Sequence, residues 1–320
     1  MADLIINNGT VITWDDNEKF RVLKDHSVVI DRGKILSIVP SALCKDMADI
    51  VIDAGAKVVI PAFVNAHTHF YSTFATGLLG IAPYENFGEV LEHLWWRLDR
   101  KLTLRDCYYS ALVASISAIR HGTVFIFDHH SSPGAIRGSL FEIAKAVGEA
   151  GLRASLCYEV SDRDGKAVAC AGIEENLDFI QSVRGGKKGF IRALFGLHAS
   201  FTLTNKTMKT VSEATALSTG FHIHVAEGVL DEADAKSKYR MRVIPRLEKY
   251  GICGPDTVYA HGVHLDDLEM DYLKKSGTVL VHNPQSNMNN GVGALDLLRI
   301  KNKGIHVGLG TDAMTMNMME

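Results

Sequence analysis

The sequence predicts an α/β fold, a (β/α)8 TIM-like barrel (residues 57–320) that carries a small N-terminal β-sandwich unit (residues 1–56). Two observations indicate this fold. Eight short apolar runs alternate with longer stretches whose apolar residues recur every three or four positions, the pattern of parallel strands covered by helices. Polar residues cluster where these runs end, and the active site of a (β/α)8 barrel lies at the ends of its strands.

Residues 1–56 differ in character from the rest of the chain. They contain short β-branched runs, LIINNGTVITW, SVVIDRGKILSIV and DIVIDAGAKVVI, separated by the turn signals NG, DRG and AG. β-branched residues favour strands, and such turns favour hairpins. We therefore expect this segment to form a small unit of antiparallel strands.

The barrel strands are expected in the runs VVIPAFVNAHTH, TVFIFDHH, RASLCYEV, IRALFGLHAS, GFHIHVAE, TVYAHGVH, TVLVHNPQ and HVGLGTD. Between them, stretches such as LTLRDCYYSALVASISAIRH have helical spacing, and Gly122 follows this one as a stop signal. A doubly wound open sheet is the alternative fold. It requires a Gly-rich phosphate turn, and the sequence contains no GxGxxG or Walker motif. Because the last run ends at Asp312, eight residues before the end of the sequence, we expect the C-terminal part of the fold to be missing.

The composition limits the classes of function. Hydrophobic residues make up 47% of the 320 residues, charged residues 22%, and the net charge is −3, which gives no electrostatic basis for binding nucleic acid or anionic membranes. No apolar run is long enough to cross a bilayer, and the N-terminus lacks the pattern of a secretory signal. The five cysteines are scattered, without a CxxC pair, as is typical of a reducing compartment. We therefore expect a cytoplasmic protein.

The most informative motif is His67-Thr68-His69 at the end of the first apolar run. Positions i and i+2 of a strand face the same way, so both imidazoles can reach one metal ion. With fourteen histidines in the chain, about one such pair is expected by chance. The motif therefore gains its meaning from the residues at the ends of the later strands.

Further candidate ligands and acids follow the other strands. They are His198 after strand four, His224 and Glu227 after strand five, His261 after strand six and Asp312 after strand eight. Three imidazoles and one carboxylate suit a borderline cation such as Zn²⁺ and leave one position for water. Fe²⁺ accepts the same ligands, so the residue types do not choose between the two metals.

This set of residues predicts hydrolysis. A bound metal lowers the pKa of its water toward neutrality, and Asp312 could then accept the water proton. Glu227 could carry a proton to a ring nitrogen or to a leaving group as a general acid–base. His261 could hold the attacking water or stabilise charge that develops on the substrate.

Six motifs, PAFVNAHTH, LHASFTL, HIHVAEG, AHGVHLD, VHNPQSNMNNGVG and GLGTDA, occur in order on the expected strands. With them the chain resembles the amidohydrolase superfamily. The similarity is to its mononuclear aminohydrolase branch, which includes guanine, cytosine and S-adenosylhomocysteine deaminases and triazine hydrolases. Within that branch the chain is most similar to the SsnA-type aminohydrolases.

The resemblance implies one divalent metal ion, Zn²⁺ first, held by His67, His69, His224 and Asp312. It also implies that Glu227 is the proton shuttle and that His261 orients the hydrolytic water. His198 matches a substrate-contacting position, and Asn287 lies in a motif of the pocket wall. Binuclear relatives carry a carboxylated lysine at the end of strand four, where this chain reads GLHA. The resemblance further suggests a homodimer that acts on a small heterocyclic molecule.

Two groups of residues keep alternative interpretations. Trp95 and Trp96 lie in an amphipathic pattern that favours helix packing, although one ring, here taken as Trp95, could stack on a flat heterocycle at the mouth of the pocket. We interpret the remaining histidines near the strands as structural, hydrogen-bonded residues; they are His129, His130, His222, His264, His282 and His306.

Three functions remain open at this point. The first is hydrolytic deamination of a purine-like or pyrimidine-like heterocycle, with release of ammonia. The second uses the same activated water to hydrolyse a cyclic amide or to displace chloride from a chlorinated heterocycle. The third is a catalytically dead barrel that binds a metabolite, which the presence of Glu227, His261 and Asp312 disfavours.

Overall fold

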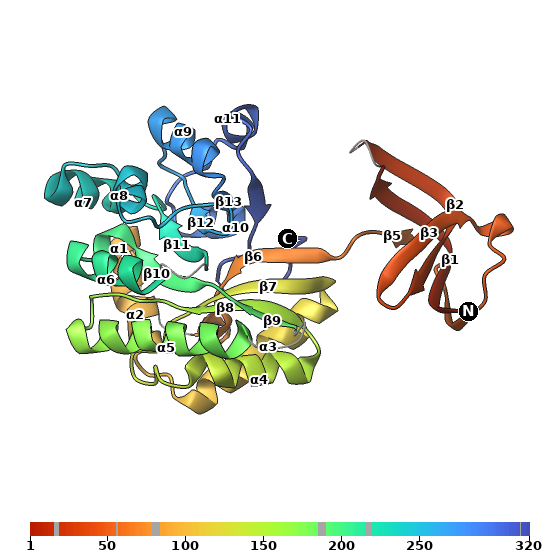
Figure 1. Ribbon diagram of the computed structural model, residues 1–320, viewed down its shortest axis with the longest axis horizontal. Coiled ribbons are helices and arrows are strands. Elements are labelled where there is room, and N and C mark those ends of the chain that lie inside the picture. Colours follow the sequence, from red (N-terminus) through yellow and green to blue (C-terminus); the bar gives the residue numbers. More distant parts are fainter. Residues whose placement is uncertain (16–18, 56, 79–83, 185–189, 216–218, 314) are drawn as a thin grey trace. The chain divides into compact units, whose positions relative to one another are not determined.

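The computed structural model describes residues 1–15, 19–55, 57–78, 84–184, 190–215, 219–313 and 315–320. The chain divides into two compact units, Met1–Ala62 and Phe63–Glu320, shown in Figure 1. The sequence placed the boundary earlier, before residue 57. The first unit extends further because strand β5 (Val58–Val59) pairs with strand β1 (Ala2–Trp14).

The first unit is one five-stranded sheet in the order β3-β2-β1-β4, with β5 also paired to β1. Its remaining strands are β2 (Phe20–Asp31), β3 (Lys34–Pro40) and β4 (Ala48–Asp53). The prediction of antiparallel strands is confirmed for β1–β2 and β2–β3 but is wrong for β4 and β5, which run parallel to β1. After β3 the chain does not make another hairpin. It crosses through the turn Ser41–Leu43 and pairs β4 with β1 rather than with β3.

The second unit is an α/β structure with two parallel sheets, in the orders β6-β7-β8-β9 and β10-β11-β12-β13-β14. The strands are β6 (Phe63–Thr68), β7 (Thr123–His130), β8 (Arg153–Tyr158), β9 (Ile191–Ala193), β10 (Phe195–Ala199), β11 (Phe221–Val225), β12 (Val258–His261), β13 (Val279–His282) and β14 (Val307–Leu309). The fourth expected strand is split at Leu194, so that β9 pairs with β8 and β10 pairs with β11.

Isolated parallel bridges join the edges of the two sheets, Thr68 to Asp312 and Val160 to Leu197. At the first of these edges, the Asp312 backbone N–H donates to the His67 carbonyl and the His69 N–H donates to the Asp312 carbonyl, both at 3.0 Å. The segments that follow β6 and β14 therefore lie side by side. This contact brings the end of the chain beside the HxH motif.

Helices connect these strands. They are α1 (Phe87–Val90), α2 (Trp96–Asp99), α3 (Leu104–Arg120), α4 (Ser139–Ala150), α5 (Lys166–Arg184), α6 (Asn205–Thr215), α7 (Val229–Tyr239), α8 (Val243–Lys249), α9 (Asp267–Ser276), α10 (Pro284–Asn289) and α11 (Leu297–Asn302), with a π-helical turn Leu91–Trp95 between α1 and α2. Figure 1 shows α3, α4 and α5 along the β6–β9 sheet. Helix α3 begins as its sequence indicates, because Thr103 and Asp106 form a capping box. No described helix is long and apolar enough to cross a membrane.

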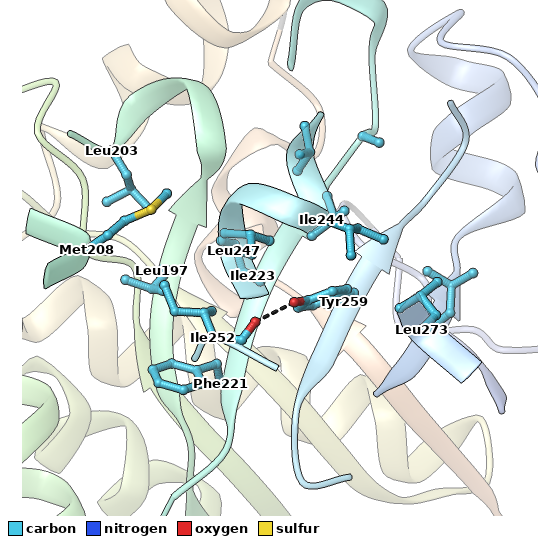
Figure 2. Close-up of a cluster of buried hydrophobic side chains, with 14 of the residues drawn as sticks. Leu197, Leu203, Met208, Phe221, Ile223, Ile244, Leu247, Ile252, Tyr259 and Leu273 are labelled. Atoms are coloured by element: carbon cyan, nitrogen blue, oxygen red, sulfur yellow. Dashed lines mark hydrogen bonds between the residues drawn. The ribbon is translucent and has the colours of Figure 1, made fainter. Parts of the chain in front are cut away.

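A large apolar cluster fixes the strands β10, β11 and β12 (Figure 2). Leu197, Ile223 and Tyr259 come from these strands, and all three are fully buried. They share one cluster with side chains of the surrounding helices, which include Met208, Ile244, Leu247 and Leu273. Each such side chain contributes about 1.5–3 kcal/mol through burial. The cluster therefore holds three consecutive strand ends in place, and these ends carry His198, His224 and His261.

Candidate metal and substrate site

Four of the predicted residues meet where the strands end. They are His67, His69, His224 and Asp312, and their possible ligand atoms all lie within 4.8 Å of one another. The Asp312 Oδ1 atom is 3.1 Å from His67 Nε2 and 3.0 Å from His69 Nε2. The His224 Nε2 atom is 3.2 Å from His69 Nε2. All four residues are buried.

Backbone carbonyls fix the direction in which two of these imidazoles present their lone pairs. The Nδ1 atom of His69 lies 2.5 Å from the His129 carbonyl oxygen, and that of His224 lies 2.9 Å from the His198 carbonyl oxygen. A carbonyl only accepts, so Nδ1 carries the proton in both rings and Nε2 keeps its lone pair when the ring is neutral. In the neutral rings, two lone pairs and a carboxylate oxygen thus face one another, an arrangement that a divalent cation fits.

Asp312 is held by its surroundings in an uncommon backbone conformation, with φ of 60°. The hydroxyl of Thr68 donates to its carbonyl at 2.7 Å, and the hydroxyl of Ser286 donates to its Oδ2 at 2.5 Å. Burial acts to raise the pKa of the Asp312 carboxyl, but His67 and His69 lower this pKa by more, so the group is ionised. Ala226 and His261, at the ends of β11 and β12, also have positive φ. Strain of this kind gathers at functional sites.

A glycine is required just before Asp312. A Cβ atom at Gly310 would lie 2.3 Å from the Asn283 Oδ1 atom and 2.7 Å from the His67 carbonyl oxygen. Contacts this short do not occur between real atoms of these types, so only glycine lets the chain pass between β6 and the segment after β13. The glycine of the GTD motif is therefore required for steric reasons, and the aspartate of the motif supplies the carboxylate.

Glu227 and His261 lie beside the four-residue cluster. The His261 Nε2 atom is 3.6 Å from Glu227 Oε2 and 3.9 Å from Asp312 Oδ2. Its Nδ1 atom lies 2.9 Å from Asn287 Oδ1. Burial, opposed by His261, raises the pKa of the Glu227 carboxyl to about 7. Asn290 donates its side-chain amide to Glu227 Oε1 at 3.3 Å.

A pocket opens on this cluster. Its walls include five aromatic side chains, Tyr71, Phe87, Trp95, Trp96 and Phe201. Of the three predicted substrate-contacting residues, His198 and Trp95 line the pocket. Asn287 does not: its side chain is 1% exposed and contacts His261 instead. The structure therefore places Asn287 against His261 rather than on the pocket wall.

Several pocket residues escaped the sequence analysis. Glu159 follows β8, at the end of the run RASLCYEV, and the rule that strand-end polar residues converge would have found it. Its Oε2 atom is 3.3 Å from the Nδ1 atom of His129, whose Nε2 atom lies within hydrogen-bonding distance of two backbone carbonyls, as expected of a structural histidine. His222 has the structural position we expected, with its Nε2 atom 2.8 Å from His67 Nδ1. Asp231 lies in α7 and Asn290 directly follows α10, so neither had a strand-end signal.

Comparisons with known proteins settle the family. Residues 58–320 match the Amidohydrolase family. The chain belongs to this family. Among its relatives is the 5'-deoxyadenosine deaminase of Methanosarcina mazei, 34% identical over 99% of this chain and 70% of the relative. Another is the 5-methylthioadenosine/S-adenosylhomocysteine deaminase of Thermococcus sibiricus, 33% identical over 98% of this chain and 70% of the relative.

Solved structures share the fold. The guanine deaminase of C. acetobutylicum superposes with a TM-score of 0.87 at 20% identity, over 98% of this chain and 76% of that one. The adenosine deaminase of Xanthomonas campestris with bound zinc gives 0.83 at 21% identity, over 99% and 70%. Family and relatives together confirm two predictions, the aminohydrolase resemblance and a hydrolase acting on carbon–nitrogen bonds other than peptide bonds.

Proposed function

We propose that the protein is a metal-dependent aminohydrolase that deaminates a purine-like or pyrimidine-like heterocycle. Water adds to the ring carbon that bears the amino group, the carbon–nitrogen bond breaks, and ammonia leaves. One observation carries the proposal: a buried His3Asp cluster opens into an aromatic pocket beside a carboxyl group whose pKa lies near neutrality. The deaminase names of the relatives support it.

The proposed metal ion is Zn²⁺, held by His67, His69, His224 and Asp312. When bound, it would supply a Lewis acid that makes water nucleophilic near neutral pH. Fe²⁺ would accept the same donors. The zinc in the adenosine deaminase of Xanthomonas campestris, which shares the fold, favours zinc here. One ion is proposed because the strand β10 (Phe195–Ala199) ends without a lysine.

The chain's own residues would handle the protons. Burial raises the pKa of Glu227 to about 7, so its carboxyl can take a proton from the water and pass it to a ring nitrogen or to the leaving amino group. His261 would hold the water through Nε2, because its other nitrogen is occupied by Asn287. The Asp312 Oδ2 atom, which accepts from Ser286, is the alternative acceptor for the water proton.

The aromatic walls would bind a flat ring. Trp95 lies edge-on to Tyr71, with ring centroids 6.3 Å apart, and both line the pocket together with His198. A heterocycle bound between these groups would have its amino-bearing carbon facing the cluster. We also propose that the two bridged parallel sheets form one closed (β/α)8 barrel, that the enzyme is cytoplasmic, as its unpaired cysteines suggest, and that it is a homodimer, as its family suggests.

The test is ammonia release from a panel of purines, oxidised purines and pyrimidines. Metal-assayed wild-type protein is compared with Glu227→Gln. Release that requires one bound metal ion per chain and collapses in the variant supports the proposal. Full metal occupancy with no ammonia from any amino-heterocycle contradicts deamination and favours hydrolysis of a cyclic amide or a chlorinated ring at the same site.

A further inference from the structure

Glu159 is a pocket carboxylate that the proposed mechanism does not use. It directly follows strand β8, is 5% exposed and lines the pocket. Separate sets of possible ligand atoms place it within 4.8 Å of His69 and of His224, so it adjoins the cluster as Glu227 does. Its Oε2 atom lies 3.3 Å from His129, whereas its Oε1 atom is 3.8 Å from His198 Nε2, too far for a hydrogen bond.

The hydrogen bonds of His198 determine which of its nitrogens carries the proton. Its Nδ1 atom lies 2.7 Å from the Thr202 hydroxyl oxygen, and that hydroxyl donates its own proton to the Ala199 carbonyl. Nδ1 must therefore donate to Thr202, and Nε2 keeps a lone pair in the neutral ring. Burial lowers the pKa of His198 to about 4, so the neutral ring prevails at pH 7.

Two acceptors thus lie side by side on the pocket wall. Burial acts to raise the pKa of the Glu159 carboxyl, but the positive charge around it, including the Arg163 guanidinium, lowers this pKa by more, which keeps the group ionised. Among the described residues no donor hydrogen-bonds Glu159 Oε1. A buried charged acceptor without a donor is costly, so a bound molecule that brings an N–H to this point gains binding free energy.

We propose that Glu159 and His198 select heterocycles in which the amino-bearing carbon lies between an unprotonated ring nitrogen and a ring N–H. Such rings are cyclic guanidines, as in guanine or isocytosine. The unprotonated nitrogen would face Glu227, which must protonate it, and the N–H would face Glu159. The inference deepens the proposed function and rests on it for this orientation.

Adenine-type rings lack the second feature. The amino-bearing carbon of adenine is flanked by one ring nitrogen without a proton and by a ring carbon, and the next ring nitrogen on that side is also an acceptor in the nucleosides. An acceptor facing the ionised Glu159 repels it and leaves the carboxylate unpaired. The proposed preference therefore differs from the adenosine-type substrates in the names of the curated relatives.

Ligands that differ only in the N–H test the proposal directly. Binding of guanine, 1-methylguanine and adenine is measured by calorimetry on the metal-loaded Glu227→Gln protein, in which turnover does not interfere. We expect guanine to bind about 10²-fold more tightly than the other two, the size of a hydrogen bond to a charged group. With Glu159→Gln added, the preference should fall below about threefold. Glu213→Gln, an exposed carboxylate on α6, is the matched control and should change nothing.

Each outcome decides one question. Equal binding of guanine and 1-methylguanine overturns the proposal, and because this comparison needs no change at Glu159, misfolding of that variant cannot obscure it. A preference that survives Glu159→Gln also overturns the role of this residue. Absence of ammonia release by the metal-loaded wild-type protein would instead contradict the proposed function, while the binding preference would still be measured.

Discussion

The two sides of the pocket carry the same residue type in opposite electrostatic states. On one side, burial raises the pKa of Glu227 to about 7, and a single amide of Asn290 and the His261 ring are its nearest partners. On the other side, the pKa of Glu159 lies below its usual range despite burial, because of nearby positive charge that includes the Arg163 guanidinium. A carboxyl group near neutrality can move protons, whereas one that stays ionised can only accept hydrogen bonds.

The two pKa values differ because different charged groups lie near Glu159 and near Glu227. Arg163 is itself fixed by Asp99, with which it forms a buried ion pair, and its guanidinium stacks at 5.2 Å from the Trp96 ring centroid. This fixed cation lowers the pKa of Glu159 through space. Beside Glu227, by contrast, the ionised Asp312 acts to raise the pKa of the carboxyl. Identical residues therefore receive different roles from their neighbours.

The largest effect is expected from loss of the metal ion, which lies between the two carboxyl groups in the proposed mechanism. His224→Ala should release the metal ion and lower kcat/KM by at least about 10³-fold, because the Lewis acid supplies several kcal/mol. Metal analysis and ammonia release measure this. His121→Ala, an exposed histidine that ends α3, is the control and should retain both the metal and activity. Full metal occupancy in His224→Ala would show that the cluster does not bind the ion as proposed.

Glu227→Gln and Glu159→Gln should separate the two sides kinetically. Loss of the proton carrier in Glu227→Gln should lower kcat by about 10²–10⁴-fold with little change in substrate affinity. Glu159→Gln should mainly raise KM for a cyclic guanidine, since it removes a binding contact. Steady-state kinetics on one substrate measures both. The same loss of kcat in the two variants would refute the division of roles.

A smaller effect on kcat is expected from Asn287, which contacts His261. Asn287→Ala should free the His261 ring and lower kcat by about 10–100-fold, the usual size for an outer residue that orients a site. Asn287→Asp, which keeps an oxygen at this place, should recover part of the activity. Both variants should keep their metal. Unchanged activity in Asn287→Ala would mean that Asn287 does not position His261.

The smallest expected effect is on stability, and it concerns the buried residue Asp231. Asp231 accepts the backbone N–H groups of Phe201 and Ala226, and burial raises its pKa to about 7. The folded state holds this proton more tightly than the unfolded chain, so the stabilisation is present at low pH and is lost as pH rises from about 4 to 7. The slope for one proton is at most about 1.4 kcal/mol per pH unit. Urea midpoints at several pH values should fall more steeply for wild type than for Asp231→Asn, and parallel curves would contradict this.

The sequence predicted most of the cluster because the signal was local. Each of His67, His69, His224 and His261 ends a recognisable apolar run, and parallel strand ends converge. The eighth run led to Asp312 in the same way, although β14 itself stops at Leu309. The roles of these residues stay proposals, but their convergence is visible in the structure.

The rest depended on contacts that no local pattern encodes. Asn287 of α10 contacts His261 of β12 through one side-chain hydrogen bond, and the state of Glu159 depends on Arg163 from another segment. The parallel direction of β4 and β5 in the first unit likewise depends on which edge of β1 remains open. Each of these three features depends on tertiary contacts between residues that are far apart in the sequence.

The central claim is that the cluster and its two flanking carboxylates deaminate a heterocycle with one metal ion. The most direct measurement is ammonia release from guanine and adenine by wild-type protein of known metal content, before and after chelation. We predict release that follows metal occupancy and favours guanine. Ammonia release that persists in metal-free protein would contradict the account.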